Sequence, residues 1–326
     1  MKKILAITVA SIIAAGSITA CSAEAATNEV SDEKISIVTT IFPEYDWVMN
    51  MLGDNPAGAE VTMLLDDGVD LHSYQPTVDD IMKIADCDLF IYVGGESDEW
   101  VEDALAEATN DDMIVINLLD VLGDSVVEEE VVEGMEGEEE EAEEEEGPEY
   151  DEHVWLSLRN AKVLVESIKE ALVTIDPDNE STYSQNADSY EAELTVLDEE
   201  YSAVVSQAAC DTVLFGDRFP FRYMTDDYGL NYYAAFVGCS AETEASFETI
   251  TFLANKVDEL SLTAVLTIEG ADHSIAETIV ENTSAQDQQI LTLDSMQSVT
   301  ASDVEAGASY ISIMESNLEV LREALS

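Results

Sequence analysis

The chain has 326 residues, enough for about two domains, and 46% of them are hydrophobic, as is typical of a globular protein with packed cores. Its charge is extreme, because 11 Lys and Arg residues stand against 72 Asp and Glu residues, for a formal net charge of −61. Such a surface excludes binding to nucleic-acid phosphates and electrostatic docking on anionic lipid. It favours either cationic ligands or simply a well-solvated surface.

The first residues have the pattern of an exported protein. Lys2 and Lys3 precede an apolar run that ends in small residues, which is typical of a secretory signal peptide. The end of this run, "ITAC", resembles a bacterial lipobox, and the resemblance implies that Cys21 becomes the mature N-terminus and carries a lipid anchor. An ordinary signal peptide with an incidental cysteine remains an alternative. No later segment is apolar enough to span a bilayer, so we expect an extracytoplasmic protein held at the cell membrane by its lipid.

Strand and helix patterns alternate after a small, polar tether at 22–33. The first block has strands predicted over 34–42, 59–65, 88–94 and 113–120, and helices over 44–54, 77–87 and 98–108. Such alternation is typical of a mainly parallel, doubly wound sheet, in which ligands bind in loops at the carboxyl ends of strands. His72 lies in such a loop.

An acidic segment interrupts this pattern. Residues 128–152 contain 16 acidic side chains and no Lys or Arg. Like charges this dense repel each other and predict a disordered surface insertion, which we place at 128–149. It either captures cations weakly near a site or is simply a solvated loop.

The second half repeats the alternation after two helices. Helices are predicted over 153–172 and 180–208, followed by strands over 211–217, 230–238, 262–270 and 288–296, and helices over 222–229, 246–260, 273–283 and about 302–325. The helix over 180–208 is long for a small α/β domain and suits a spine between two domains.

We therefore predict an α/β fold with two similar doubly wound lobes joined by a long rigid linker helix. After the signal peptide (1–21) and the tether, the N-terminal lobe covers 34–178, the linker helix 179–208 and the C-terminal lobe 209–326.

Three cysteines remain if Cys21 carries lipid. Cys210 and Cys239 flank consecutive predicted strands, so a disulfide between them and three unpaired thiols, Cys87 included, are both open. None of them has the paired spacing of a structural zinc site.

The chain has only three histidines, His72, His153 and His273. The first two are 81 residues apart, so they form no local helical pair. If both lie in the cleft between lobes, their imidazoles together with carboxylates could hold a divalent cation, either zinc or, with two carboxylates, manganese or iron. The alternative for each is a surface or capping role.

Several motifs in order resemble the zinc/manganese solute-binding lipoproteins of ABC transporters. They include "VTTIFPEYDWVMNMLGD", "DLHSYQPTVDDIMKIADCDLFIYVGG", "DEHVWLSLRNAKVLVESIKEALVTIDPDN", "IEGADHSIAETIVENT" and "LTLDSM". The resemblance covers nearly the whole mature chain. It implies a monomeric, non-enzymatic protein that captures zinc or manganese between its lobes and delivers the ion to an ABC permease.

The same resemblance implies a set of metal ligands. His72 in "HSYQPT" and His153 in "DEHVW" stand at the family's two histidine positions. The third position falls in "GDRFPFRYMTDDYGL", where an alignment without a gap gives Arg218 and a shift of one residue gives Asp217. Because Arg stays protonated, it cannot be a ligand, although it could neutralise an acid in the site.

The fourth family position is an acid. Asp294 in the last predicted strand and Glu269 at the end of the preceding one are the two candidates. Two imidazoles with Asp217 and Asp294 would favour manganese or iron. His273 is either a replacement ligand or a helix cap.

Two other classes of function compete with metal delivery. A secreted metalloenzyme is disfavoured, because the sequence has neither an H-E-x-x-H motif nor a nucleophile elbow. A surface lipoprotein that acts as an adhesin or interaction protein, with a degenerate metal site, is the main alternative, and Arg218 is its best support.

Overall fold

The computed structural model describes residues 34–137, 149–240, 244–270 and 272–326. Its strands are β1 (Ser36–Thr39), β2 (Glu60–Met63), β3 (Leu89–Tyr92), β4 (Ile114–Asn117), β5 (Thr212–Phe219), β6 (Asn231–Val237), β7 (Ala264–Ile268) and β8 (Gln289–Leu293). Its α-helices are α1 (Phe42–Leu52), α2 (Val78–Asp86), α3 (Trp100–Ala106), α4 (Leu118–Leu122), α5 (Leu158–Ile175), α6 (Glu180–Gln207), α7 (Arg222–Tyr228), α8 (Phe247–Leu260), α9 (Ser274–Glu281), α10 (Ala301–Glu305) and α11 (Tyr310–Ala324). Short 3₁₀ turns include η1 (Leu71–Ser73), η2 (Glu96–Asp98), η3 (Gly123–Ser125), η4 (Val154–Leu156) and η5 (Pro177–Asn179). Among the described residues, no helix has the length and apolar character needed to cross a membrane.

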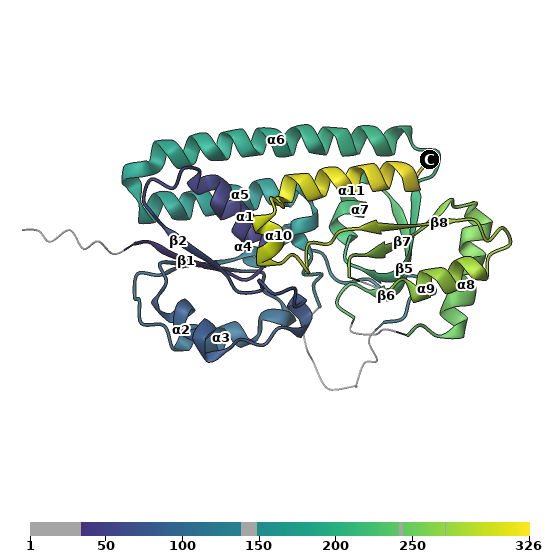
Figure 1. Cartoon of the computed structure of the whole chain (residues 1–326), viewed down its shortest axis with the longest axis horizontal. Helices are drawn as coiled ribbons and strands as arrows, with labels where there is room; N and C mark the ends of the chain where they lie inside the picture. Colours follow the sequence, from purple (N-terminus) through teal and green to yellow (C-terminus); the bar gives the residue numbers. More distant parts are fainter. Residues whose placement is uncertain (1–33, 138–148, 241–243, 271) are drawn as a thin grey trace, which may run out of the picture. The chain divides into compact units, whose positions relative to one another are not determined.

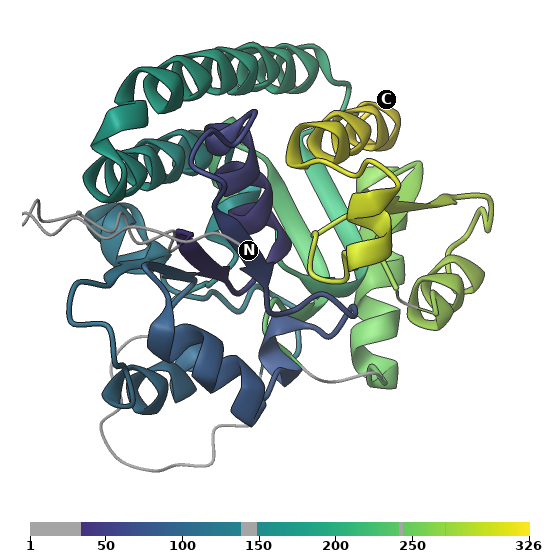
Figure 2. The same ribbon diagram turned by 60° about the vertical axis from the view of Figure 1, so that its left-hand side comes forward.

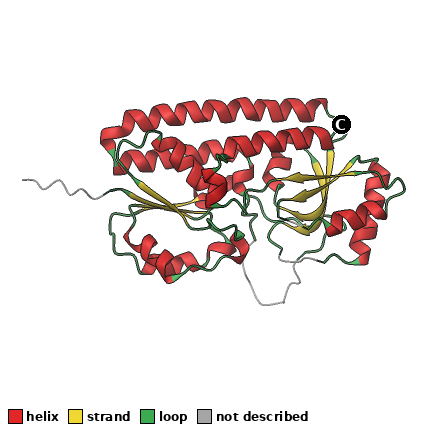
Figure 3. Cartoon of the chain, viewed as in Figure 1, coloured by secondary structure: helices red, strands yellow, loops and turns green. Residues whose placement is uncertain are grey.

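The strands form two parallel four-stranded sheets with the same strand permutation. Their orders are β2-β1-β3-β4 and β6-β5-β7-β8, and Figure 3 shows them as two separate groups of strands with helices around them. β1, β3 and β7 are almost continuously buried, as expected for parallel strands covered on both faces. The predicted fold class is confirmed.

The long helix α6 spans both sheets. It has 28 residues and lies alongside α5 and α11, which face different sheets, as Figures 1 and 2 show. One stripe of α6 is buried at intervals of three and four residues, which is the spacing of one helix face: Tyr183, Ala187, Tyr190, Leu194, Leu197 and Tyr201. One hydrophobic cluster runs from the first sheet through these helices into the second. The buried face of α6 is therefore part of one hydrophobic core shared by both sheets.

Two predicted helices differ in detail. The one predicted from 153 starts later, because the Ser157 hydroxyl accepts the amides of Arg159 and Asn160 as an N-cap. The last predicted helix is two helices, α10 and α11. Gly307 between them has φ +100°, which a continuous right-handed helix does not allow, and Ser309 caps the second.

The acidic insertion also differs from the prediction in its first part. Residues 128–137 cross from the first sheet to the second, where Glu136 pairs with Phe236 at the edge of β6. Glu130 forms an ion pair with Arg222 on α7. Residues 138–148 lie outside the described residues, as do Cys21 and the tether. Cys87, Cys210 and Cys239 are all free thiols, so the disulfide alternative does not hold.

Candidate metal centre

His72 is held in the loop that follows β2. The carboxylate of Asp70 caps the turn η1 by accepting the backbone N–H of His72 at 3.0 Å. The neighbouring Leu71 is 1% exposed and anchors the turn in the core. After this loop, Thr77 and Asp80 form a capping box that starts α2, so both ends of the loop are fixed.

His153 comes from the segment just before α5 and is completely buried. One oxygen of Asp151 accepts both the backbone N–H of His153, at 2.9 Å, and its ring Nδ1, at 3.0 Å. The three residues that follow His153 are buried in η4, and the indole of Trp155 donates to the carbonyl of Ser295. The imidazole of His153 is thus held in place by the residues that precede it and by those that follow it in the sequence.

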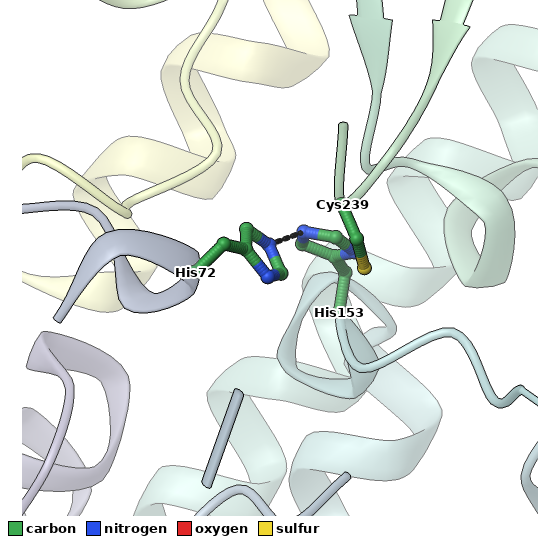
Figure 4. A group of neighbouring side chains, drawn as sticks. All are labelled: His72, His153 and Cys239. Carbon is green, nitrogen blue, oxygen red and sulfur yellow. Dashed lines mark hydrogen bonds between the residues drawn. The ribbon is translucent and has the colours of Figure 1, made fainter. Parts of the chain in front are cut away.

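Cys239 completes the group from the second sheet. It lies two residues beyond the end of β6, at the carboxyl edge of the sheet. His72, His153 and Cys239 each offer one ligand atom, and these atoms lie within 4.8 Å of one another (Figure 4). The adjacent Gly238 allows this approach, because a Cβ there would lie 2.9 Å from Cε1 of His153.

Cys239 is not among the ligands expected from the sequence. Two signals could have found it: the three cysteines that remain if Cys21 carries a lipid, and a position just past the end of a parallel strand. Cys239 is 86 residues from His153 in the sequence, so no local motif connects the two residues.

The two imidazoles face each other through their Nε2 atoms, 3.1 Å apart (Figure 4). Because Asp151 accepts from Nδ1 of His153, we assign a free lone pair to Nε2 of that ring. His72 then donates from Nε2, and its Nδ1 accepts the Ser97 hydroxyl at 2.7 Å. Burial, together with the neighbouring His153, lowers the pKa of His72 to about 3. The ring is therefore neutral at neutral pH, which is the form that binds metals.

Acidic side chains surround the group. Glu152 is 2% exposed, and its Oε2 lies 3.5 Å from Nδ1 of His72. Burial and the acids Glu152, Asp151 and Glu129 raise the pKa of the Cys239 thiol well above its usual value. The thiol is therefore protonated at neutral pH, and a metal ion bound by its sulfur would have to displace that proton.

Among the described residues, the acids expected from the sequence are not part of this group. Asp217 accepts the N–H of Arg218 and of Ile268, and Glu269 accepts the N–H and hydroxyl of Ser295. Asp294 accepts the N–H of Met296, and burial with the nearby Glu269 raises its pKa to about 6.

Arg218 and His273 also lie outside the His72–His153–Cys239 group. Arg218 forms an ion pair with Asp70, which joins β5 to the loop of His72. His273 caps α9 with φ +60° and contacts the Thr267 hydroxyl. Both residues border a cavity of about 510 Å³ between the two sheets, together with Asp70, Asp217 and Glu269.

A protein-family model described as "Zinc-uptake complex component A periplasmic" matches residues 37–324. The chain belongs to this family. The resemblance found in the sequence is thereby confirmed, and the family is one of metal-uptake proteins rather than enzymes.

Individual relatives agree. The chain is 32% identical over 297 residues to the zinc-binding lipoprotein AdcA of Streptococcus pneumoniae, covering 90% of this chain and 56% of AdcA. It is 28% identical to the high-affinity zinc uptake system protein ZnuA of Bacillus subtilis, covering 90% of this chain and 88% of ZnuA. The chain therefore spans little more than half the length of some curated relatives that it matches.

A solved structure shares the fold. The crystal structure of the Zn(II)-bound ZnuA-like domain of Streptococcus pneumoniae AdcA superposes with a TM-score of 0.70 at 28% identity. The match covers 90% of this chain and 99% of that domain.

Proposed function

We propose that this protein captures zinc outside the cytoplasm, with His72, His153 and Cys239 as ligands, and delivers it to an ABC permease. One observation carries the proposal: two imidazole nitrogens and a thiol from loops of two different sheets come within 4.8 Å of one another. Membership of a zinc-uptake family supports the same conclusion.

The donor types favour zinc over manganese. Imidazole nitrogen and thiolate sulfur are ligands that suit zinc, whereas manganese prefers carboxylate, carbonyl and water oxygens. The set considered from the sequence, with Asp217 and Asp294, would have favoured manganese or iron. Both of those carboxylates accept backbone N–H groups, and neither belongs to the His72–His153–Cys239 group.

The surroundings support binding of a cation. Asp151 accepts from the ring of His153, and such a carboxylate behind a histidine ligand orients the ring and strengthens its basicity. Asp151 and Glu152 are both 2% exposed, so their charges act through little water.

Location and partner complete the proposal. The lipobox-like "ITAC" supports a lipid anchor at Cys21, in keeping with the lipoprotein name of AdcA. We infer a monomer at the cell membrane whose lobes, 34–178 and 209–326, present the bound ion to the permease of the same uptake system.

Zinc and manganese competition on the mature chain tests the proposal. We expect one tight zinc equivalent, and a loss of zinc affinity of at least about tenfold in His72→Ala, His153→Ala and Cys239→Ser. His273→Ala is the matched control and should bind zinc as the unaltered protein does. No tight zinc equivalent, or tight zinc that survives all three substitutions, would contradict the proposal and favour the interaction-protein alternative.

A further inference from the structure

His72, His153 and Cys239 offer three donor atoms, and a closed protein site for zinc uses four. The fourth ligand is either another side chain or a water molecule. A side chain in that position must come from a segment that reaches Cys239 or the histidines, and its donor atom must not be committed to a strong partner.

Glu129 meets the first condition. It lies at the start of the acidic insertion. Its N–H donates to the carbonyl of Glu149 at 2.9 Å, and the neighbouring Glu128 pairs with Tyr150. Its backbone is therefore fixed by a short antiparallel contact. Its Oε1 accepts the N–H of Cys239 at 3.4 Å, so the carboxylate faces the cysteine.

Glu129 also meets the second condition. Among the described ion pairs, Glu129 has no Lys or Arg partner, in contrast to its neighbour Glu130, which pairs with Arg222. Its hydrogen bond from the Cys239 N–H is long, at 3.4 Å, so moving the carboxylate costs little.

Two of the other nearby acids, Asp151 and Asp70, are committed. Asp151 uses one oxygen for both the N–H and the ring of His153. Asp70 pairs with Arg218 and caps the turn of His72. Glu152 accepts the N–H of Ser97 through Oε1, and its Oε2 has no hydrogen-bond partner among the described residues. That oxygen lies at Nδ1 of His72, on the other side of the ring from the Nε2 atom that faces His153.

We propose that Glu129 supplies the fourth zinc ligand by turning its carboxylate from the Cys239 amide to the ion. This inference rests on the proposed zinc site. The resulting set has two neutral imidazoles, one thiolate and one carboxylate, so its two negative charges match the charge of Zn²⁺. The start of the acidic insertion then contributes a ligand to the metal site.

The substitution Glu129→Gln tests the proposal, with Glu128→Gln as the matched control on the exposed neighbour. Gln keeps a carbonyl oxygen that can accept the Cys239 N–H, so a purely structural role would survive the change. We expect zinc affinity, measured by competition with a chromophoric chelator, to fall at least about tenfold in Glu129→Gln and to stay within about twofold in Glu128→Gln.

Cobalt(II) in place of zinc gives a second readout. Added azide should leave the visible spectrum of the unaltered protein unchanged, because the four positions are filled by side chains. In Glu129→Gln, a solvent molecule takes the fourth position and azide should change the spectrum. Thermal unfolding of the metal-free variants checks that they are folded.

The outcomes separate this inference from the proposed function. Tight zinc binding by the unaltered protein that Glu129→Gln retains within about twofold, with an azide response already present in the unaltered protein, overturns the role of Glu129 and leaves the three-residue site standing. Absence of tight zinc in the unaltered protein overturns both.

Discussion

At the scale of single residues, the site depends on side chains that differ from the ligands implied by the family resemblance. Arg218 stands at the position where the family resemblance implies a ligand, and its guanidinium pairs with Asp70 instead. Both side chains are only about one-fifth exposed, at 19% and 21%. The pair therefore neutralises a carboxylate two residues from His72. Cys239, just beyond the end of β6, offers a sulfur donor instead.

This arrangement leads to a prediction for metal selectivity. In Arg218→Gln, the carboxylate of Asp70 loses its cation and becomes available beside His72. Because carboxylates suit manganese, we expect the affinity for manganese relative to zinc to rise about tenfold or more in competition titrations.

The double variant Arg218→Gln/Asp70→Asn is the control for this prediction. It should return the ratio toward that of the unaltered protein, since it lacks the freed carboxylate. An unchanged ratio in the single variant, with native thermal stability, would show that the ion pair has no part in selectivity.

At the scale of elements, α1 contains two buried acidic side chains, Glu44 and Asp46. Glu44 is fully buried, and one of its oxygens accepts the N–H groups of Thr40 and Ile41 and the Thr40 hydroxyl. Burial, reinforced by the charge of Asp98, raises the pKa of Glu44 to about 8. Burial also raises the pKa of Asp98 to about 7. The protonated carboxyl groups are thus the forms that suit the folded core.

The sign of the pH effect follows from these shifts. Between the ordinary pKa of 4.5 and about 8, the folded protein holds a proton on Glu44 that the unfolded chain releases. The free energy of unfolding therefore falls as pH rises through this window.

Glu44→Gln keeps an uncharged acceptor at this position, so its stability should depend less on pH. We expect the melting temperature of the metal-free protein to fall by a few degrees more between pH 5 and pH 8 than that of Glu44→Gln. The exposed α5 variant Glu170→Gln should follow the unaltered protein. Parallel pH profiles for the unaltered protein and Glu44→Gln would refute the assignment.

At the scale of the whole molecule, the net charge of −61 opposes compaction, while one apolar cluster holds both sheets to α5, α6 and α11. Only 11 Lys and Arg residues are available for ion pairs, so repulsion between acids outweighs attraction over the surface. The molecule is held together by its shared core.

Salt should therefore stabilise this protein. Screening reduces the repulsion among acids over distances beyond about 10 Å at 0.1 M salt. We expect the melting temperature of the metal-free protein to rise by a few degrees from low salt to about 0.5 M NaCl. KCl should have the same effect at equal ionic strength, which separates screening from binding of a particular ion. A melting temperature that falls with salt would show that attractive pairs dominate.

The sequence by itself determined the local and repeated features of this protein. The alternation of buried strands with helices, the stripe along α6 and the cap at Thr77 depend on residues a few positions apart, so their pattern is visible in a single chain. The loop that carries His72 follows from the same alternation, whereas the pattern predicts a helix already at His153.

Only the tertiary structure decided which side chains meet. The order of strands in two sheets, joined through a common core, brings Cys239 to the histidines and directs Arg218 to Asp70. It also places Glu269 against Ser295 and leaves Glu129 facing the cysteine. These contacts join residues tens to hundreds of positions apart, and no local periodicity encodes such distances, because they depend on the packing of whole elements against one another.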